Sequence, residues 1–308
     1  MSHTHLHSHS HQHDHHHVHP SAVSHSRAFA VGIALNVIFV VVELVYGLIA
    51  NSSALLADAG HNASDVLGLV FAWTAAWLAT IRPHGKYTYG LRKSTILVSI
   101  LNALLLFGAV VLIGWDAIGK FKNPAPVAGT QVIIVATIGI IINTATAMMF
   151  MKGQKNDLNV RGAFLHMAAD AGVSLGVVIA GILINITGLQ WIDPITSLLI
   201  IIVILWSTWR LFTDSIDLAL DAVPKNIKLG EVKSFILSQG EVLNVHDLHI
   251  WAISTTQVAL TAHVVVNSNP NDAFIGDLQK ELEKRFSINH TTFQIENEVI
   301  EKECHPIV

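Results

Sequence analysis

The chain has 308 residues, of which 52% are hydrophobic and only 13% charged, and its formal net charge is -4. Soluble domains carry about 25% charged residues, so this composition excludes an ordinary soluble protein and indicates a membrane protein. The single cysteine, Cys304, excludes an internal disulfide framework. The N-terminus is polar and rich in histidine, without the basic and apolar regions of a secretory signal, so no cleavable signal peptide is expected.

Residues 1–26 contain eleven of the nineteen histidines, interleaved with Ser, Thr, Gln and Asp. A segment of this composition cannot bury a core, so we predict a disordered tail. A weak, multivalent metal collector is one interpretation of it. A dispensable tract and an expression tag are the alternatives.

Six apolar segments follow, and each is long enough for the roughly 20 residues that a membrane-spanning helix needs. They run over residues 27–50, 54–79, 93–115, 129–151, 162–187 and 192–212. If all six span, nine basic residues between Arg27 and Arg210 lie on one side of the membrane, and only Lys120 and Lys122 lie on the other. Positively charged loops stay in the cytoplasm, so both termini are predicted to be cytoplasmic. Residues 27–212 are therefore predicted to form an all-α transmembrane domain.

One short pattern occurs twice within these segments. The second segment contains His61 and Asp65, and the fifth contains His166 and Asp170. Positions i and i+4 lie on the same face of a helix, so each pair directs an imidazole and a carboxylate the same way. Ionisable groups inside a bilayer are costly and usually functional. Two facing pairs supply two nitrogens and two oxygens, which are the ligands of a tetrahedral zinc site.

The depths of the two pairs agree with such a site. The second segment runs inward from outside and the fifth runs outward from the cytoplasm. At 1.5 Å per residue the pairs lie ~15 Å and ~12 Å deep, against a hydrocarbon core of ~30 Å. The sequence therefore predicts that the two pairs meet near the middle of the membrane.

Other polar residues in these segments have two interpretations each. Asn36, Glu43 and Gly47 share one face of the first segment, which fits either a water-lined pathway or helix–helix hydrogen bonding. Asp58 lies on the same helix face as His61. It is either a carboxylate that orients the imidazole of His61 or a carboxylate at the entrance to the site. Asp193 precedes Pro194, a pattern that favours an N-cap followed by proline in the first helical position over a ligand role for Asp193.

Residues 213–308 have a soluble pattern. Helices are predicted at 227–239 and 271–286, and strands at 244–253, 258–266 and 291–299. The order αββαβ is typical of a small open-faced α+β sandwich. Histidines in strands are more often structural than ligating, but this region concentrates potential metal ligands. They are His246, His249, His263, His290, Glu296, Cys304 and His305.

These features together resemble the cation diffusion facilitator family, specifically its zinc-transporting branch of bacterial zinc and cadmium efflux proteins. The resemblance rests on LLADAGHNASD and HMAADAGVSLGV in the second and fifth segments, on RPHGKYTYGLRKS after the second, and on VHDLHIW and HTTFQIE near the end. It covers residues 27–300. Two His-x-x-x-Asp helices in a six-helix frame are specific together, although either alone is weak.

The resemblance implies a homodimer in the bacterial inner membrane that exports Zn²⁺ from the cytoplasm in exchange for protons. Its transport site is expected to be His61, Asp65, His166 and Asp170, with histidine at the first position favouring zinc over cadmium or manganese. No organic cofactor and no nucleic-acid partner are expected.

The resemblance also implies a metallochaperone-like cytoplasmic domain that dimerises and binds regulatory metal. His246 and His263 match its usual ligands, and Glu296 is a further candidate. Gln294 replaces a histidine ligand of some relatives, which argues against a two-metal site. His84 lies where the loop after the second helix can hold another metal.

Two other classes of protein compete with a transporter. An intramembrane metalloenzyme needs three ligands, an open position and a general base, yet neither motif has a Glu beside its histidine. A zinc-binding sensor or storage protein without transport fits the tail and the soluble domain, but leaves two buried ionisable pairs at matching depth without a role.

Overall fold

The computed structural model describes residues 27–151, 158–267 and 272–297, and it begins with six long helices. The predicted tail, residues 1–26, lies outside the described residues, as do Cys304 and His305. The long helices are α1 (Arg27–Ile49), α2 (Ser53–Ala79), α3 (Ser94–Lys122), α4 (Gly129–Phe150), α5 (Leu158–Thr187) and α6 (Ile192–Ala219).

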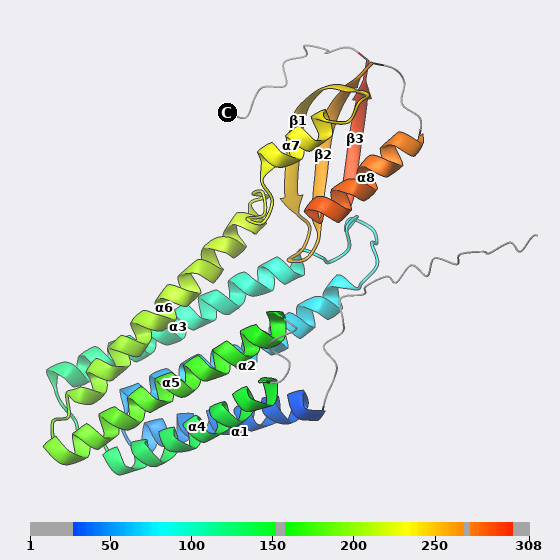
Figure 1. Cartoon of the computed structure of the whole chain (residues 1–308). Coiled ribbons are helices and arrows are strands. Elements are labelled where there is room, and N and C mark those ends of the chain that lie inside the picture. The colour runs from blue at the N-terminus through cyan, green and yellow to red at the C-terminus, as the bar shows by residue number, and fades with distance from the viewer. Residues whose placement is uncertain (1–26, 152–157, 268–271, 298–308) are drawn as a thin grey trace, which may run out of the picture.

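These six helices form an elongated bundle in which α4 packs along α5 and α3 along α6 (Figure 1). Within the described residues, α3, α4, α5 and α6 are each long and apolar enough to cross a membrane. Their outer surfaces are apolar: Trp115 is 81% exposed and Trp206 is 82% exposed. A continuous exposed apolar surface of this kind belongs in lipid rather than in water, which agrees with the predicted membrane domain.

Three of the helices are longer than the hydropathy pattern predicts. α3 continues to Lys122 instead of residue 115, α6 continues to Ala219 instead of residue 212, and α5 begins at Leu158 instead of residue 162. Hydropathy reports where the apolar segment ends, whereas the helix continues as long as its backbone hydrogen bonds do. The extension of α6 carries the chain out of the bundle and leads into the C-terminal domain (Figure 1).

The C-terminal domain contains α7 (Leu229–Leu237), β1 (Val242–Ala252), β2 (Val258–Val266), α8 (Asp272–Phe286) and β3 (His290–Glu296). The strands form a sheet in the order β1-β2-β3, with β1 antiparallel and β3 parallel to β2. Both helices cover one face of this sheet. The predicted order αββαβ is therefore confirmed, with element ends that differ from the prediction by three residues at most.

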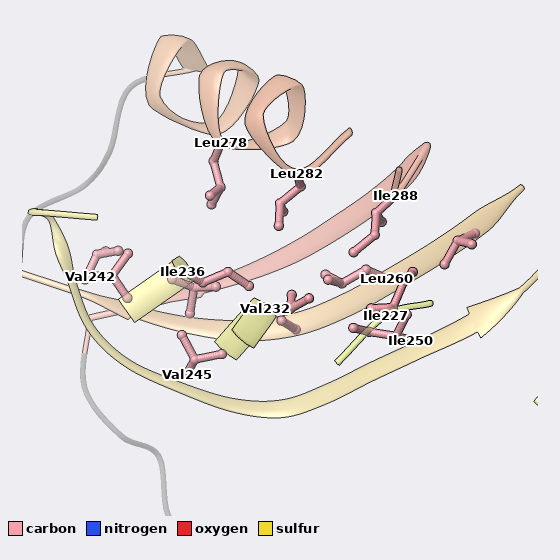
Figure 2. Packing of buried hydrophobic residues seen from close by; sticks show 14 residues of the cluster. Ile227, Val232, Ile236, Val242, Val245, Ile250, Leu260, Leu278, Leu282 and Ile288 are labelled. Atoms are coloured by element: carbon pink, nitrogen blue, oxygen red, sulfur yellow. The ribbon is translucent and has the colours of Figure 1, made fainter. Parts of the chain in front are cut away.

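One apolar core holds this domain together (Figure 2). Leu282 of α8 and Ile236 of α7 are fully buried and point toward the sheet, where Leu260 of β2 is also fully buried. Full burial of one such side chain is worth roughly 1.5–3 kcal/mol. Among the described residues, no helix covers the other face of the sheet.

The two parts of the chain touch at the end of the bundle that we call the domain end, where α2 finishes and α3 begins. Lys93 forms an ion pair with Asp221 at 2.8 Å. The backbone N–H of Thr255, between β1 and β2, donates to the hydroxyl of Thr95 at 3.1 Å. We call the opposite end, where α2 and α6 begin, the far end.

At the far end the start of α2 is fastened by a carboxylate from another helix. Asp193 of α6 accepts hydrogen bonds from the Ser52 hydroxyl at 2.5 Å, the Ser53 N–H at 2.7 Å and the Ala54 N–H at 3.3 Å. The prediction that Asp193 is the N-cap of its own helix is wrong, because α6 already begins at Ile192. Its negative charge instead satisfies the free N–H groups and the dipole at the start of α2.

This arrangement predicts a large stability difference between two substitutions in α6. Asp193→Ala leaves two buried N–H groups without acceptors, which costs roughly 2–4 kcal/mol. We expect the thermal unfolding midpoint of the purified protein in detergent to fall by about 5–10 °C. Asp214→Ala is the matched control, since its exposed pair with Lys225 is worth at most about 1 kcal/mol. Equal midpoints for the two variants would contradict the assigned role of Asp193.

Candidate metal centres

The two His-x-x-x-Asp pairs face each other across the bundle from α2 and α5. His61 Nε2 lies 3.8 Å from Asp65 Oδ2 in its own helix and 3.3 Å from Asp170 Oδ1 in α5. His166 Nε2 lies 3.2 Å from Asp65 Oδ2 and 3.7 Å from Asp170 Oδ2. The two imidazole rings meet edge to face, with centroids 6.0 Å apart. The structure thus brings together all four residues that the sequence singled out.

The exposure of these four side chains differs along the bundle. Asp170 is 2% exposed and His61 is 18% exposed, whereas Asp65 is 32% and His166 is 42% exposed. Asp65 lies one turn closer to the domain end than His61, and His166 lies one turn closer than Asp170. The cluster is therefore accessible from the direction of the domain end and covered toward the far end.

Toward the far end the cluster is followed by buried polar contacts and then by apolar packing. The Ser174 hydroxyl donates to Asp58 Oδ2 at 2.8 Å, and the Asn62 amide donates to Glu43 Oε2 at 3.0 Å. Beyond them, buried apolar side chains such as Leu55 and Val132 fill the space between the helices. Within the described residues this packing closes the far end.

These contacts decide two interpretations that the sequence left open. Glu43 bonds to Asn62 of α2, and a Cβ on Gly47 would come within 2.8 Å of Leu56, so this face of α1 is a helix-packing face. Asp58 bonds to Ser174, while His61 Nδ1 has no hydrogen-bond partner among the described residues. Asp58 therefore does not orient the imidazole of His61 through a hydrogen bond.

A second group of potential ligands lies on the sheet of the C-terminal domain, one residue on each strand. His246 of β1 is paired in register with His263 of β2, and Glu296 of β3 lies two positions beyond Gln294, the register partner of His263. Glu296 Oε2 lies 2.9 Å from His246 Nε2, and Glu296 Oε1 lies 3.0 Å from His263 Nδ1. Because the ligand atoms of all three residues lie within 4.8 Å of one another, they can contact one metal ion.

The surroundings favour the ionised form of Glu296. Burial opposes ionisation, but hydrogen bonds from His246 and Gln294 and the nearby charges of His246 and His263 hold the pKa of Glu296 below its usual value. The side-chain amide of Gln294 donates to Glu296 Oε1 at 2.8 Å. It therefore positions a candidate ligand.

Sequence reasoning missed Asp247. Its backbone has a φ of 48° at an irregularity between His246 and His249 in the β1–β2 register. The irregularity directs the Asp247 carboxylate to within 3.4 Å of His263 Nε2 and 2.9 Å of His249 Nε2. The sequence offered one signal for a ligand here, an aspartate close to two histidines. Regular strand alternation, however, would place the Asp247 side chain on the opposite face of the sheet from His246.

The remaining candidate histidines do not join either group. His84 is exposed in the loop between α2 and α3, where its Nδ1 lies 3.1 Å from the Arg82 carbonyl oxygen. His290 stacks edge to face on Tyr89, with centroids 5.7 Å apart. Nothing in the described residues gathers further ligands around these two. Cys304 and His305 lie outside them.

Comparison with known proteins identifies both parts of the chain. Residues 29–218 match the model of the cation efflux transmembrane domain, and residues 224–298 match that of the cation efflux protein cytoplasmic domain. The metal cation efflux system protein CzcD of Cupriavidus metallidurans is 36% identical, over 88% of this chain and 87% of its own length. The zinc transporter ZitB of Escherichia coli is 35% identical, over 87% and 86%.

A third relative, the cadmium, cobalt and zinc/H(+)-K(+) antiporter of Bacillus subtilis, is 35% identical over 84% of this chain and 85% of its own. The solved metal-bound C-terminal domain of the CzcD transporter is 39% identical, covering 23% of this chain and 99% of that domain, with a TM-score of 0.21. The transmembrane match alone spans more than half of the sequence. The chain therefore belongs to the zinc-transporting branch of the cation diffusion facilitator (cation efflux) family and is a multi-pass membrane exporter of metal cations.

Proposed function

We propose that this exporter is a secondary transporter that moves Zn²⁺ out of the cytoplasm in exchange for protons. The transport site is His61, Asp65, His166 and Asp170. The observation that carries the proposal is the convergence of these side chains from two helices inside the bundle.

The ligand atoms and their spacing suit zinc. Zinc binds nitrogen and oxygen at about 2.0–2.2 Å in tetrahedral geometry, which places neighbouring ligand atoms ~3.4 Å apart. The His–Asp distances in the cluster lie between 3.2 and 3.8 Å. Two carboxylates also match the charge of a divalent cation, so that the bound ion leaves no net charge inside the membrane.

The distribution of basic residues supports a cytoplasmic domain end. Four basic residues, Arg82, Lys86, Arg92 and Lys93, lie in the loop between α2 and α3, whereas the far end carries Lys120 and Lys122. Positive loops remain in the cytoplasm, and the C-terminal match to a cytoplasmic domain agrees with this orientation. The cluster would then open to the cytoplasm, in the inner membrane of a bacterium, with both termini inside.

Proton exchange follows from the ligands. Zinc binds neutral imidazole and ionised carboxylate, so protons and metal compete for the same atoms. Free imidazole titrates near pH ~6.5, within the working range of a cell. The sequence contains no phosphate-binding G-x-x-x-x-G-K-[ST] loop, which favours a proton gradient over nucleotide hydrolysis as the energy source.

The C-terminal domain is proposed to dimerise and to bind regulatory zinc at His246, His263 and Glu296. The match to the cytoplasmic domain of cation efflux proteins supports this assignment. The three ligands leave a fourth position for water or another group, and Asp247 lies beside His263 to fill or to orient it.

The transport site is tested by replacing each of its four residues with Ala. Losing one of four ligands is expected to lower zinc flux from reconstituted vesicles by at least roughly 100-fold. His84→Ala is the control, because this histidine lies outside both clusters and should retain full flux. Wild-type flux from Asp65→Ala or Asp170→Ala would refute the site. A wild-type protein that binds zinc without moving it would instead indicate a sensor or storage protein.

Proton exchange is tested by calorimetric zinc titration in buffers of different ionisation enthalpy. Each proton displaced by zinc lowers the apparent affinity by up to about tenfold per pH unit as the pH falls from about 7.5 to 6. An inward proton gradient should also accelerate zinc export in stopped-flow measurements. Zinc binding without proton release, together with flux that ignores the gradient, would show a facilitator without proton exchange.

The cytoplasmic site is tested by counting zinc bound to the full-length protein. His263→Ala should remove one bound zinc per protomer and leave the transport-site zinc in place. His290→Ala serves as the control, since that histidine contacts Tyr89 instead of the cluster. An unchanged zinc count in His263→Ala would mean that His246, His263 and Glu296 form only a structural network.

A further inference from the structure

Two buried carboxyl groups stand next to the transport site without any role in holding zinc. Glu43 of α1 and Asp58 of α2 are both 0% exposed. Each has one oxygen that accepts a hydrogen bond, from Asn62 and from Ser174 respectively. Among the described residues no donor reaches the other oxygen, Glu43 Oε1 or Asp58 Oδ1.

Asp58 and Asn62 are four positions apart and share one face of α2, and the Asn62 amide holds Glu43 on that face. The two carboxyl groups are therefore neighbours. Two ionised carboxylates side by side in a buried site are strongly unfavourable, because their charges repel each other and water does not reach them. One of the pair must therefore hold a proton, as in other sites where two carboxylates share one. Their closeness and the two oxygens without donors both point to a proton as the ligand of this pair.

The surroundings of the pair contain few other charges. His61 of α2 and Asp170 of α5 act on it electrostatically. Helix α4, which packs on α1, has no ionisable residue between Gly129 and Phe150. Since no cationic side chain in the described part of the chain is in contact with the pair, the shared proton is what reduces its negative charge.

The position of the pair indicates the end of the bundle from which protons would reach the transport site. Asp58 lies almost one turn from His61 toward the far end, and Ser174, which holds Asp58, lies one turn from Asp170 in the same direction. The pair is thus between the transport site and the apolar packing that closes the far end. Outside water can reach it only after that packing opens.

We propose that the Glu43–Asp58 pair is a proton-transfer site, which passes protons from the far-end water to the transport site as zinc leaves. The inference rests on the proposed exchange of zinc for protons. When the far end opens, the pair gives its proton to the vacated transport site and takes another from the water. For each proton passed on one is regained, so the pair returns to its singly protonated state.

The experiment compares two modes of transport in full-length protein reconstituted into vesicles. Net export driven by a pH gradient requires protons to reach the transport site. Exchange of radioactive zinc for unlabelled zinc at equal pH requires none, because zinc occupies the site in both directions. Glu43→Gln keeps an acceptor for Asn62 and a donor for Asp58, but it has no proton to transfer.

We expect Glu43→Gln to lower net export at least about tenfold, as expected when a positioned proton carrier is lost, while zinc-for-zinc exchange and zinc affinity stay near wild type. Asp214→Asn, the same chemical change on the surface of α6, should affect neither mode. Equal loss of both modes would show a structural role, and no loss of either would show that the pair carries no proton. Both results overturn the proposal.

Two further measurements keep the proposal testable if Glu43→Gln does not fold. Asp58→Asn is expected to have the same selective effect on net export. Infrared spectra of the wild-type protein should contain the carbonyl band of a buried protonated carboxyl group, and its absence would overturn the proposal without any variant. If wild-type export itself ignores the pH gradient, the proposed proton exchange fails instead, which separates the two conclusions.

Discussion

An ionisable side chain inside a bilayer must be paired, and this constraint governs the membrane domain. His61 and Asp65 cannot be stable in α2 unless another helix supplies opposite partners at the same depth, and α5 supplies His166 and Asp170. The four side chains satisfy one another in contacts of 3.2–3.8 Å. Under the proposed function the same arrangement holds a divalent metal, so that the stability of the bundle and transport would depend on the same contacts.

Helix α2 is the element on which these contacts depend. It packs against α1, α3, α5 and α6, and its first turn is fixed by the carboxylate of Asp193. Because α2 is rigid, fixing its start also fixes the rotation of His61 and Asp65 about its axis. The same helix carries Asp58 and Asn62 toward α5 and α1, so one element holds the candidate transport site and the carboxyl pair in fixed relation.

Much of this was predictable from the sequence, and the rest was not for physical reasons. The spacing of four between His61 and Asp65, repeated at His166 and Asp170, specifies a common helix face, and helix length specifies depth. Asp193 was misassigned because a proline after an aspartate is a local signal, whereas its partners lie about 140 positions earlier in the chain. The same is true of the hydrogen bond between Glu43 and Asn62 and of the irregularity at Asp247. Both depend on contacts between elements, which the periodicity of the sequence does not predict.

Charge balance explains why exchange suits such a site. With two carboxylates in a low-dielectric interior, the site is most stable when its occupants carry about two positive charges. One zinc ion supplies them, and so do two protons, whereas an empty site or a site holding both is left with uncompensated charge. Under the proposed mechanism, each conformational change is therefore favoured only when the site holds one cargo or the other. The Glu43–Asp58 pair, with one proton in both resting states, adds the same charge to each and so leaves this balance undisturbed.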